Sequence, residues 1–100
     1  MPQVVRFATQ TNKSFGEFQL DLNAALQHAW GTRVMRYHWE GEVLRITAPG
    51  AEGFVAFKPG GVEAEIGMSF PATMLKTQIV ADITRTLSVA SGSPVQSANL

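Results

Sequence analysis

The sequence predicts an α+β fold in the order β-α-β-β-β-β-α, an antiparallel sheet with two helices packed on one face. Two segments with apolar residues at three- and four-residue spacing indicate the helices, and segments of two-residue alternation indicate the strands. Glycine-containing turns between the alternating segments favour hairpins. At 100 residues the chain supports one compact core. We therefore expect a single domain over residues 1–90, followed by a small, polar, frayed tail at 91–100.

The first strand is expected over residues 4–9, where β-branched and aromatic residues favour extended backbone. Its place in the sheet is left open, because nothing local fixes its partner. The next segment begins with Ser14-Phe-Gly-Glu17, which has the form of a capping box. Apolar residues then recur at helical spacing until Gly31 ends the pattern. The first helix is therefore expected over about residues 15–30.

Residues 33–39 alternate with period two, and Glu40-Gly41 is a plausible two-residue hairpin turn. With those two residues as the loop, Tyr37 faces Leu44 and the apolar pairs share one face of the sheet. Residues 49–53, which include two glycines, are expected to form a longer connection before the next strand.

The second hairpin follows the same logic, with Gly60-Gly61 as its turn. That choice pairs Phe57 with Ala64 on the core face and brings Lys58 to Glu63 on the opposite face. The agreement between the turn and the alternation supports the assignment.

The second helix is indicated by apolar residues at four-residue steps, with Pro71 suited to its first turn because the missing N–H costs nothing there. It is expected to run to about Ala90. The apolar residues at these steps are Leu75, Ile79, Ile83 and Leu87.

Composition and motifs argue against several classes of function. Eight basic and eight acidic residues balance, so no general attraction to nucleic acid is expected. There is no cysteine, and His28 and His38 lie on different elements, so we expect no metal site. No nucleophile elbow, phosphate loop or dinucleotide fingerprint is present, so we expect neither a cofactor nor catalytic residues. No apolar run is long enough to span a membrane, and the expected location is the cytoplasm.

The outer face of the sheet is the candidate contact surface. In the predicted register Arg36 faces Arg45, an unfavourable pair unless something neutralises it, and three apolar side chains lie among the charges. Simple solvation of this face and contact with a partner, such as a second copy in a homodimer, both stay open. The candidate contact residues are Val34, Arg36, His38, Val43, Arg45 and Phe54.

A second hypothesis is a small binding module that holds an acyl or other hydrophobic ligand between sheet and helices. Ordinary core packing is the competing interpretation of the same side chains. The candidate lining residues are Tyr37, Trp39, Phe57, Met68 and Met74.

Three sequence features resemble a known family: the hairpin Tyr37-His-Trp39-Glu-Gly41-Glu-Val-Leu44, the loop Pro49-Gly50-Ala-Glu-Gly53, and the Leu75-Lys76 start of the last helix. They resemble the putative polyhydroxyalkanoic acid system proteins, small bacterial proteins connected with storage-polyester granules. The resemblance implies a non-enzymatic accessory protein of the cytoplasm, with the polyester granule or its proteins as partner. It implies no catalytic residues.

Overall fold

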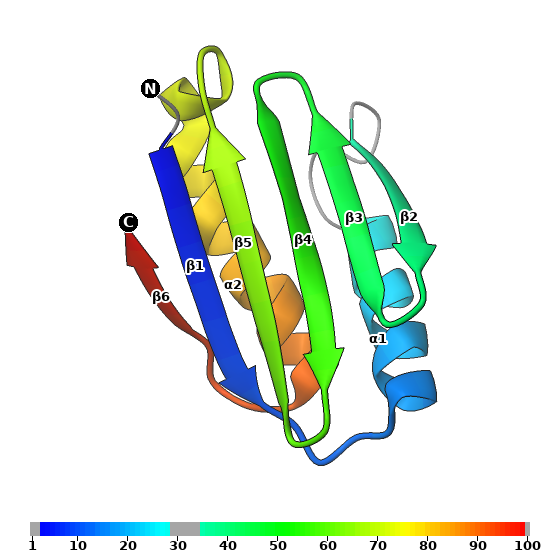
Figure 1. Ribbon diagram of the computed structural model, residues 1–100. Helices are drawn as coiled ribbons and strands as arrows, with labels where there is room; N and C mark the ends of the chain where they lie inside the picture. The colour runs from blue at the N-terminus through cyan, green and yellow to red at the C-terminus, as the bar shows by residue number, and fades with distance from the viewer. Residues whose placement is uncertain (1–2, 29–34, 100) are drawn as a thin grey trace.

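The computed structural model describes residues 3–28 and 35–99. Within them, six strands form one antiparallel sheet, and the order of strands and helices matches the predicted order as far as the second helix. Figure 1 shows both long helices on one face of this sheet, so the opposite face carries no helix. The elements are β1 (Gln3–Gln10), α1 (Phe15–His28), β2 (Arg36–Glu40), β3 (Val43–Ala48), β4 (Ala51–Lys58), β5 (Gly61–Met68), the 3₁₀ helix η1 (Ala72–Leu75), α2 (Lys76–Ser91) and β6 (Gln96–Asn99).

The sheet order β2-β3-β4-β5-β1-β6 answers the question that the sequence left open. β1 lies between β5 and β6, so the first strand pairs with two strands from the second half of the chain. The sequence predicts a frayed tail over residues 91–100 and no sixth strand there, whereas the structure has β6. Its four residues Gln96–Asn99 are polar or small and show no alternation, and pairing with β1 holds them in the sheet.

Both predicted hairpin registers are wrong by two residues. The first turn is Gly41-Glu42, with Gly41 at a φ of 62°, so Tyr37 pairs with Ile46 and Trp39 with Leu44. A two-residue turn with its positive φ at the first position needs glycine there, and the prediction had placed Gly41 second. Because the shift is two residues, every side chain keeps its predicted face.

The other two hairpins turn on proline followed by glycine. Pro59-Gly60 replaces the predicted Gly60-Gly61, and Lys58 therefore pairs with Gly61 and Phe57 with Val62. Pro49-Gly50 makes a tight turn where a longer connection was expected, so pairing resumes at Ala51. Proline fixes the negative φ of the first turn position, and both glycines supply the positive φ of the second, as a type II turn requires.

The helices begin where the sequence indicates. The capping box is present, since the Glu17 N–H donates to Ser14 Oγ and the Ser14 N–H donates to Glu17 Oε1, both at 3.3 Å. α1 ends at His28 in the described part, and residues 29 and 30 of the predicted helix lie outside it. Pro71 precedes η1 rather than opening the α-helix. α2 ends at Ser91, and Gly92 follows it as a C-cap in the left-handed conformation.

The core fills the space between the inner sheet face and the two helices. Its side chains come from five strands and both long helices, which is why a shift in any one register would disturb it. The largest fully buried side chains are Val5, Phe7, Phe18, Leu22, Leu44, Val62, Met68 and Leu87.

Candidate functional site

The outer sheet face places most of the predicted contact residues together. His38, Arg45 and Phe54 are successive cross-strand neighbours on β2, β3 and β4. Arg36 faces Thr47, not Arg45, so the predicted like-charge pair is wrong for the same reason as the register. Val43 and Phe54 are half-buried beneath their charged neighbours, and Val34 lies outside the described residues.

Several charged side chains on this face pair with one another. The Glu40 carboxylate is 3.1 Å from His38 Nε2 and accepts a 3.1 Å hydrogen bond from Arg45 Nε. Both contacts lower the pKa of the Glu40 carboxyl below its usual value, and the contact with His38 contributes most. The Arg45 guanidinium lies 5.9 Å from the centre of the Phe54 ring, within range of a cation–π contact.

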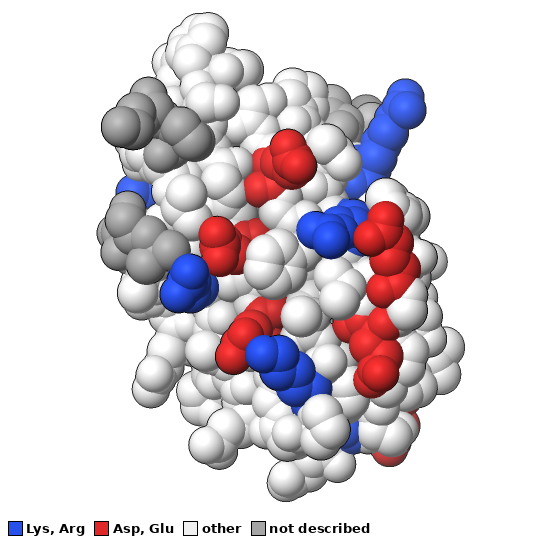
Figure 2. Space-filling view, in the orientation of Figure 1, with Lys and Arg blue, Asp and Glu red and all other residues white. Residues whose placement is uncertain are grey.

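Two more ion pairs join neighbouring strands, Arg6 to Glu65 at 3.3 Å and Lys58 to Glu63 at 3.0 Å. The second is the contact that the sequence predicted, now made diagonally rather than directly across the strands. Figure 2 views this face and shows acidic and basic side chains interspersed over it. The charged side chains of these pairs therefore have partners within the sheet.

Exposed apolar side chains gather at the other feature of interest, the connection from β5 into η1. Phe70 and Met74 are 76% and 75% exposed, and Leu75 is 47% exposed. The segment from Met68 to Leu75 holds no charged residue. In Figure 2 the lobe over this connection, at the top, carries no charged atoms. We call Phe70, Met74 and Leu75 the η1 patch, and large exposed apolar groups of this kind mark contact sites.

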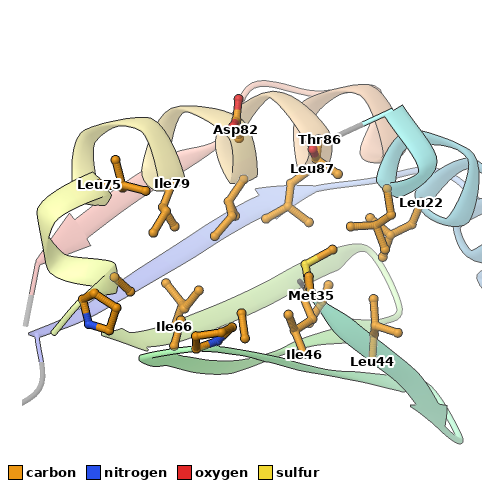
Figure 3. A pocket seen from close by; sticks show the side chains of 18 residues that line it. Leu22, Met35, Leu44, Ile46, Ile66, Leu75, Ile79, Asp82, Thr86 and Leu87 are labelled. Carbon is orange, nitrogen blue, oxygen red and sulfur yellow. The ribbon is translucent and has the colours of Figure 1, made fainter. Parts of the chain in front are cut away.

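An apolar cavity of about 330 Å³ lies between α2 and the inner sheet face. Figure 3 shows side chains from α2 and from the strands converging on this space. Its walls are almost entirely hydrocarbon. The lining residues are Leu22, Leu26, Met35, Leu44, Ile46, Ala48, Pro49, Ala51, Val55, Ile66, Pro71, Ala72, Leu75, Ile79, Asp82, Ile83, Thr86 and Leu87.

The cavity opens beside the η1 patch. Of its lining residues only Pro49, Pro71 and Leu75 are exposed, whereas the others are buried or half-buried. The turn at Gly50 packs on this end of the molecule, since the Ser69 N–H donates to the Gly50 carbonyl at 2.7 Å. We call Pro49, Pro71 and Leu75 the cavity mouth.

None of the five residues predicted to line a pocket lines this cavity. Met68 is fully buried in the core, and Met74 is exposed on the η1 patch. Trp39 donates a 3.0 Å hydrogen bond from Nε1 to Asn23 Oδ1 and packs edge-on against the Phe15 ring.

The other two, Phe57 and Tyr37, belong to the packing between sheet and core. Phe57 contacts the rings of Phe15 and Phe18, with centroids 5.6 and 5.5 Å away. Tyr37 packs against the core cluster. The aromatic residues therefore anchor the sheet to α1, and aliphatic residues surround the cavity. The small lining residues Ala48, Ala51 and Ala72 are a sequence signal that is consistent with a cavity. Small residues alone do not predict how far a helix lies from the sheet.

Within residues 3–28 and 35–99, no three His, Asp or Glu side chains gather as a metal ion would need. Asp82 is the one charged residue in the cavity lining, and its carboxylate accepts a hydrogen bond from Arg85. No helix in that part of the chain is both long and apolar enough to cross a bilayer.

Comparison with known proteins gives a family and a fold. The profile of the family described as "Putative polyhydroxyalkanoic acid system protein" matches residues 7–90, most of the chain. The NMR structure of PA4090 from Pseudomonas aeruginosa is similar at a TM-score of 0.61 and 14% sequence identity, over 98% of this chain and 96% of that one. At this identity the likeness concerns the fold alone. No curated protein sequence matches the chain.

Proposed function

Because the chain belongs to the family of putative polyhydroxyalkanoic acid system proteins, we propose that it is an accessory protein that binds the surface of polyhydroxyalkanoate granules. In this proposal it acts in the cytoplasm, by contact and without catalysis. The observation that carries the proposal is the η1 patch, an exposed apolar group in a segment without charges.

The chemistry of the polyester suits this end of the molecule better than the outer sheet face. A polyester surface offers ester groups and hydrocarbon and no charge. Contact through the outer face would remove water from ion pairs such as Arg45–Glu40 and give them no new partner, which costs free energy. Contact through Phe70 and Met74 removes only apolar surface from water, which is favourable by about 25 cal/mol per Å².

The test is binding of the purified protein to protein-free polyester particles, measured by co-sedimentation over a range of particle concentrations. The variant Phe70→Gln/Met74→Gln removes two exposed apolar side chains. If a flat surface buries about half of each, the loss is about 1 kcal/mol per residue, or about 30-fold in affinity for the pair.

The matched control is Val89→Gln, since Val89 is 63% exposed on α2 and lies about 20 Å along the helix from Leu75. Its binding should equal that of the unaltered protein. A second comparison, Val43→Glu/Phe54→Glu, probes the outer sheet face. If the Phe70→Gln/Met74→Gln protein is folded and binds as well as the unaltered protein, the η1 patch is not the contact. If the outer-face variant alone loses binding, the contact lies on that face.

A further inference from the structure

The lining of the cavity between α2 and the sheet follows the second helical segment, and we call this cavity the channel. Its lining residues on η1 and α2 run from Leu75 to Leu87, twelve residues further, a distance of about 18 Å along the helix axis. The volume of the channel is about 330 Å³.

The wall of the channel offers a ligand almost no polar partner. Sixteen of its eighteen lining residues are apolar, and the exceptions are Asp82 and Thr86. Figure 3 shows the Asp82 side chain pointing away from the sheet, and its carboxylate is paired with Arg85. Apolar cavities of this kind do not hold water well, but they do admit hydrocarbons. The part of a ligand inside the channel is therefore uncharged and apolar.

We propose that this channel binds a single medium-length acyl chain, with the chain inside and the polar end at the cavity mouth. The volume sets the length, since a cavity of about 150 Å³ already admits the six carbons of benzene. Just over twice that volume accommodates a chain of about twelve carbons. The mouth residues Pro49, Pro71 and Leu75 are the exposed part of the lining, so a polar end placed there stays in water.

The proposal predicts a dependence on chain length with a limit. Each methylene group that enters the channel adds about 0.8 kcal/mol, which is about a fourfold gain in affinity. For straight-chain carboxylates of six to fourteen carbons, affinity should rise fourfold per carbon and then level off near twelve carbons, where the channel is full. Adsorption to an open apolar surface has no such limit.

The isoleucines provide a direct readout of occupancy. The chain has four, Ile46, Ile66, Ile79 and Ile83, and all four line the channel. In protein labelled at the isoleucine δ1 and valine methyl groups, titration with decanoate should shift all four isoleucine NMR signals to saturation. The methyl signals of Val89, which is exposed and outside the lining, serve as the control and should not move.

The titration also distinguishes binding of the acyl chain from binding of the carboxylate group of the ligand. Methyl octanoate, which has an acyl chain and no carboxylate, should shift the same four isoleucine signals. If it does not, the carboxylate rather than the channel causes the binding and the proposal is wrong. Absence of isoleucine shifts with decanoate, or equal shifts at Val89, would equally overturn it.

Two substitutions fill the channel. Ile83→Trp places a larger side chain in the lining from α2, and Ala48→Leu does so from β3. Each should weaken decanoate binding at least tenfold while circular dichroism shows the fold retained, and Val89→Trp on the same helix should leave binding unchanged. Unchanged binding in both filled variants would contradict the proposal. Phe70 and Met74 do not line the channel, so the polyester test and this one succeed or fail separately.

Discussion

Gly53 gives the sharpest prediction about what this fold tolerates. It lies in β4 between Ile46 on β3 and Ile66 on β5. A Cβ atom at this position would overlap the Glu65 carbonyl oxygen and lie 3.0 Å from the Ile66 Cα. Both are backbone atoms, so no side chain can rotate away, and β4 and β5 must separate by about 1 Å to reach normal contact.

The magnitude for Gly53→Ala follows from that separation. Forcing a group into a packed region costs about 1–3 kcal/mol, and weakening one or two ladder hydrogen bonds adds about 1 kcal/mol each. We expect the free energy of unfolding to fall by about 2–5 kcal/mol, a large part of the stability of a domain of this size. Urea unfolding followed by far-ultraviolet circular dichroism measures it.

Gly67→Ala is the matched control on the neighbouring strand. Its Cβ would lie 3.8 Å from the Glu52 carbonyl oxygen, an ordinary contact. Replacing a strand glycine by alanine without strain leaves the stability unchanged or raises it by up to about 1 kcal/mol. If Gly53→Ala loses less than about 1 kcal/mol, or if both variants lose the same amount, the close approach of β4 and β5 does not constrain this position.

Three further predictions concern the ends of the elements and the outer face. Ser14→Ala removes the capping hydrogen bond of α1 and should cost about 1 kcal/mol in the free energy of unfolding, measured by thermal denaturation; an unchanged melting temperature would contradict it. Thr11→Val removes the buried 3.0 Å hydrogen bond from Thr11 Oγ1 to the Ser91 carbonyl, and urea unfolding should show a loss of about 1–3 kcal/mol, against no loss if the bond is unimportant. The Glu40 carboxyl should titrate below its usual pKa by NMR, so its ion pair with Arg45 stabilises the fold at neutral pH and is lost as the pH falls through that lowered pKa. Arg45→Gln should raise the pKa of Glu40, and an unchanged pKa would show that Arg45 does not lower it.

The sequence was sufficient to predict the faces of the strands but not their registers. Alternation assigns each side chain to the core or to solvent, and a shift of two residues leaves that assignment intact. The register of each hairpin depends on whether the other residue of the two-residue turn comes before or after the glycine. Pro59 could have settled one of them, because proline suits the position before a turn glycine of positive φ.

Gly53 shows a signal that was present in the sequence and interpreted differently. It was assigned to a loop with Gly50, but an isolated glycine within a strand often marks close approach of two backbones.

The candidate sites were less predictable than the fold. The contact residues on β2, β3 and β4 followed from alternation, so the described ones do share the outer face. The cavity did not follow, since it depends on how far α2 stands from the sheet, which no local pattern encodes. The candidate lining residues predicted from the sequence are three aromatic residues and two methionines. Phe57 instead packs against the Phe15 ring, with the ring centroids 5.6 Å apart.

The position of β1 in the sheet has a consequence for how the protein is made. β1 leaves the ribosome early, yet its partner β5 begins at Gly61, about fifty residues after β1 ends. At translation speeds of about 5–20 residues per second, Val5 and Phe7 wait several seconds without the neighbour that shields them. The meander from β2 to β4 can assemble during that delay, and the nascent chain completes its core only when β5 and then α2 have emerged.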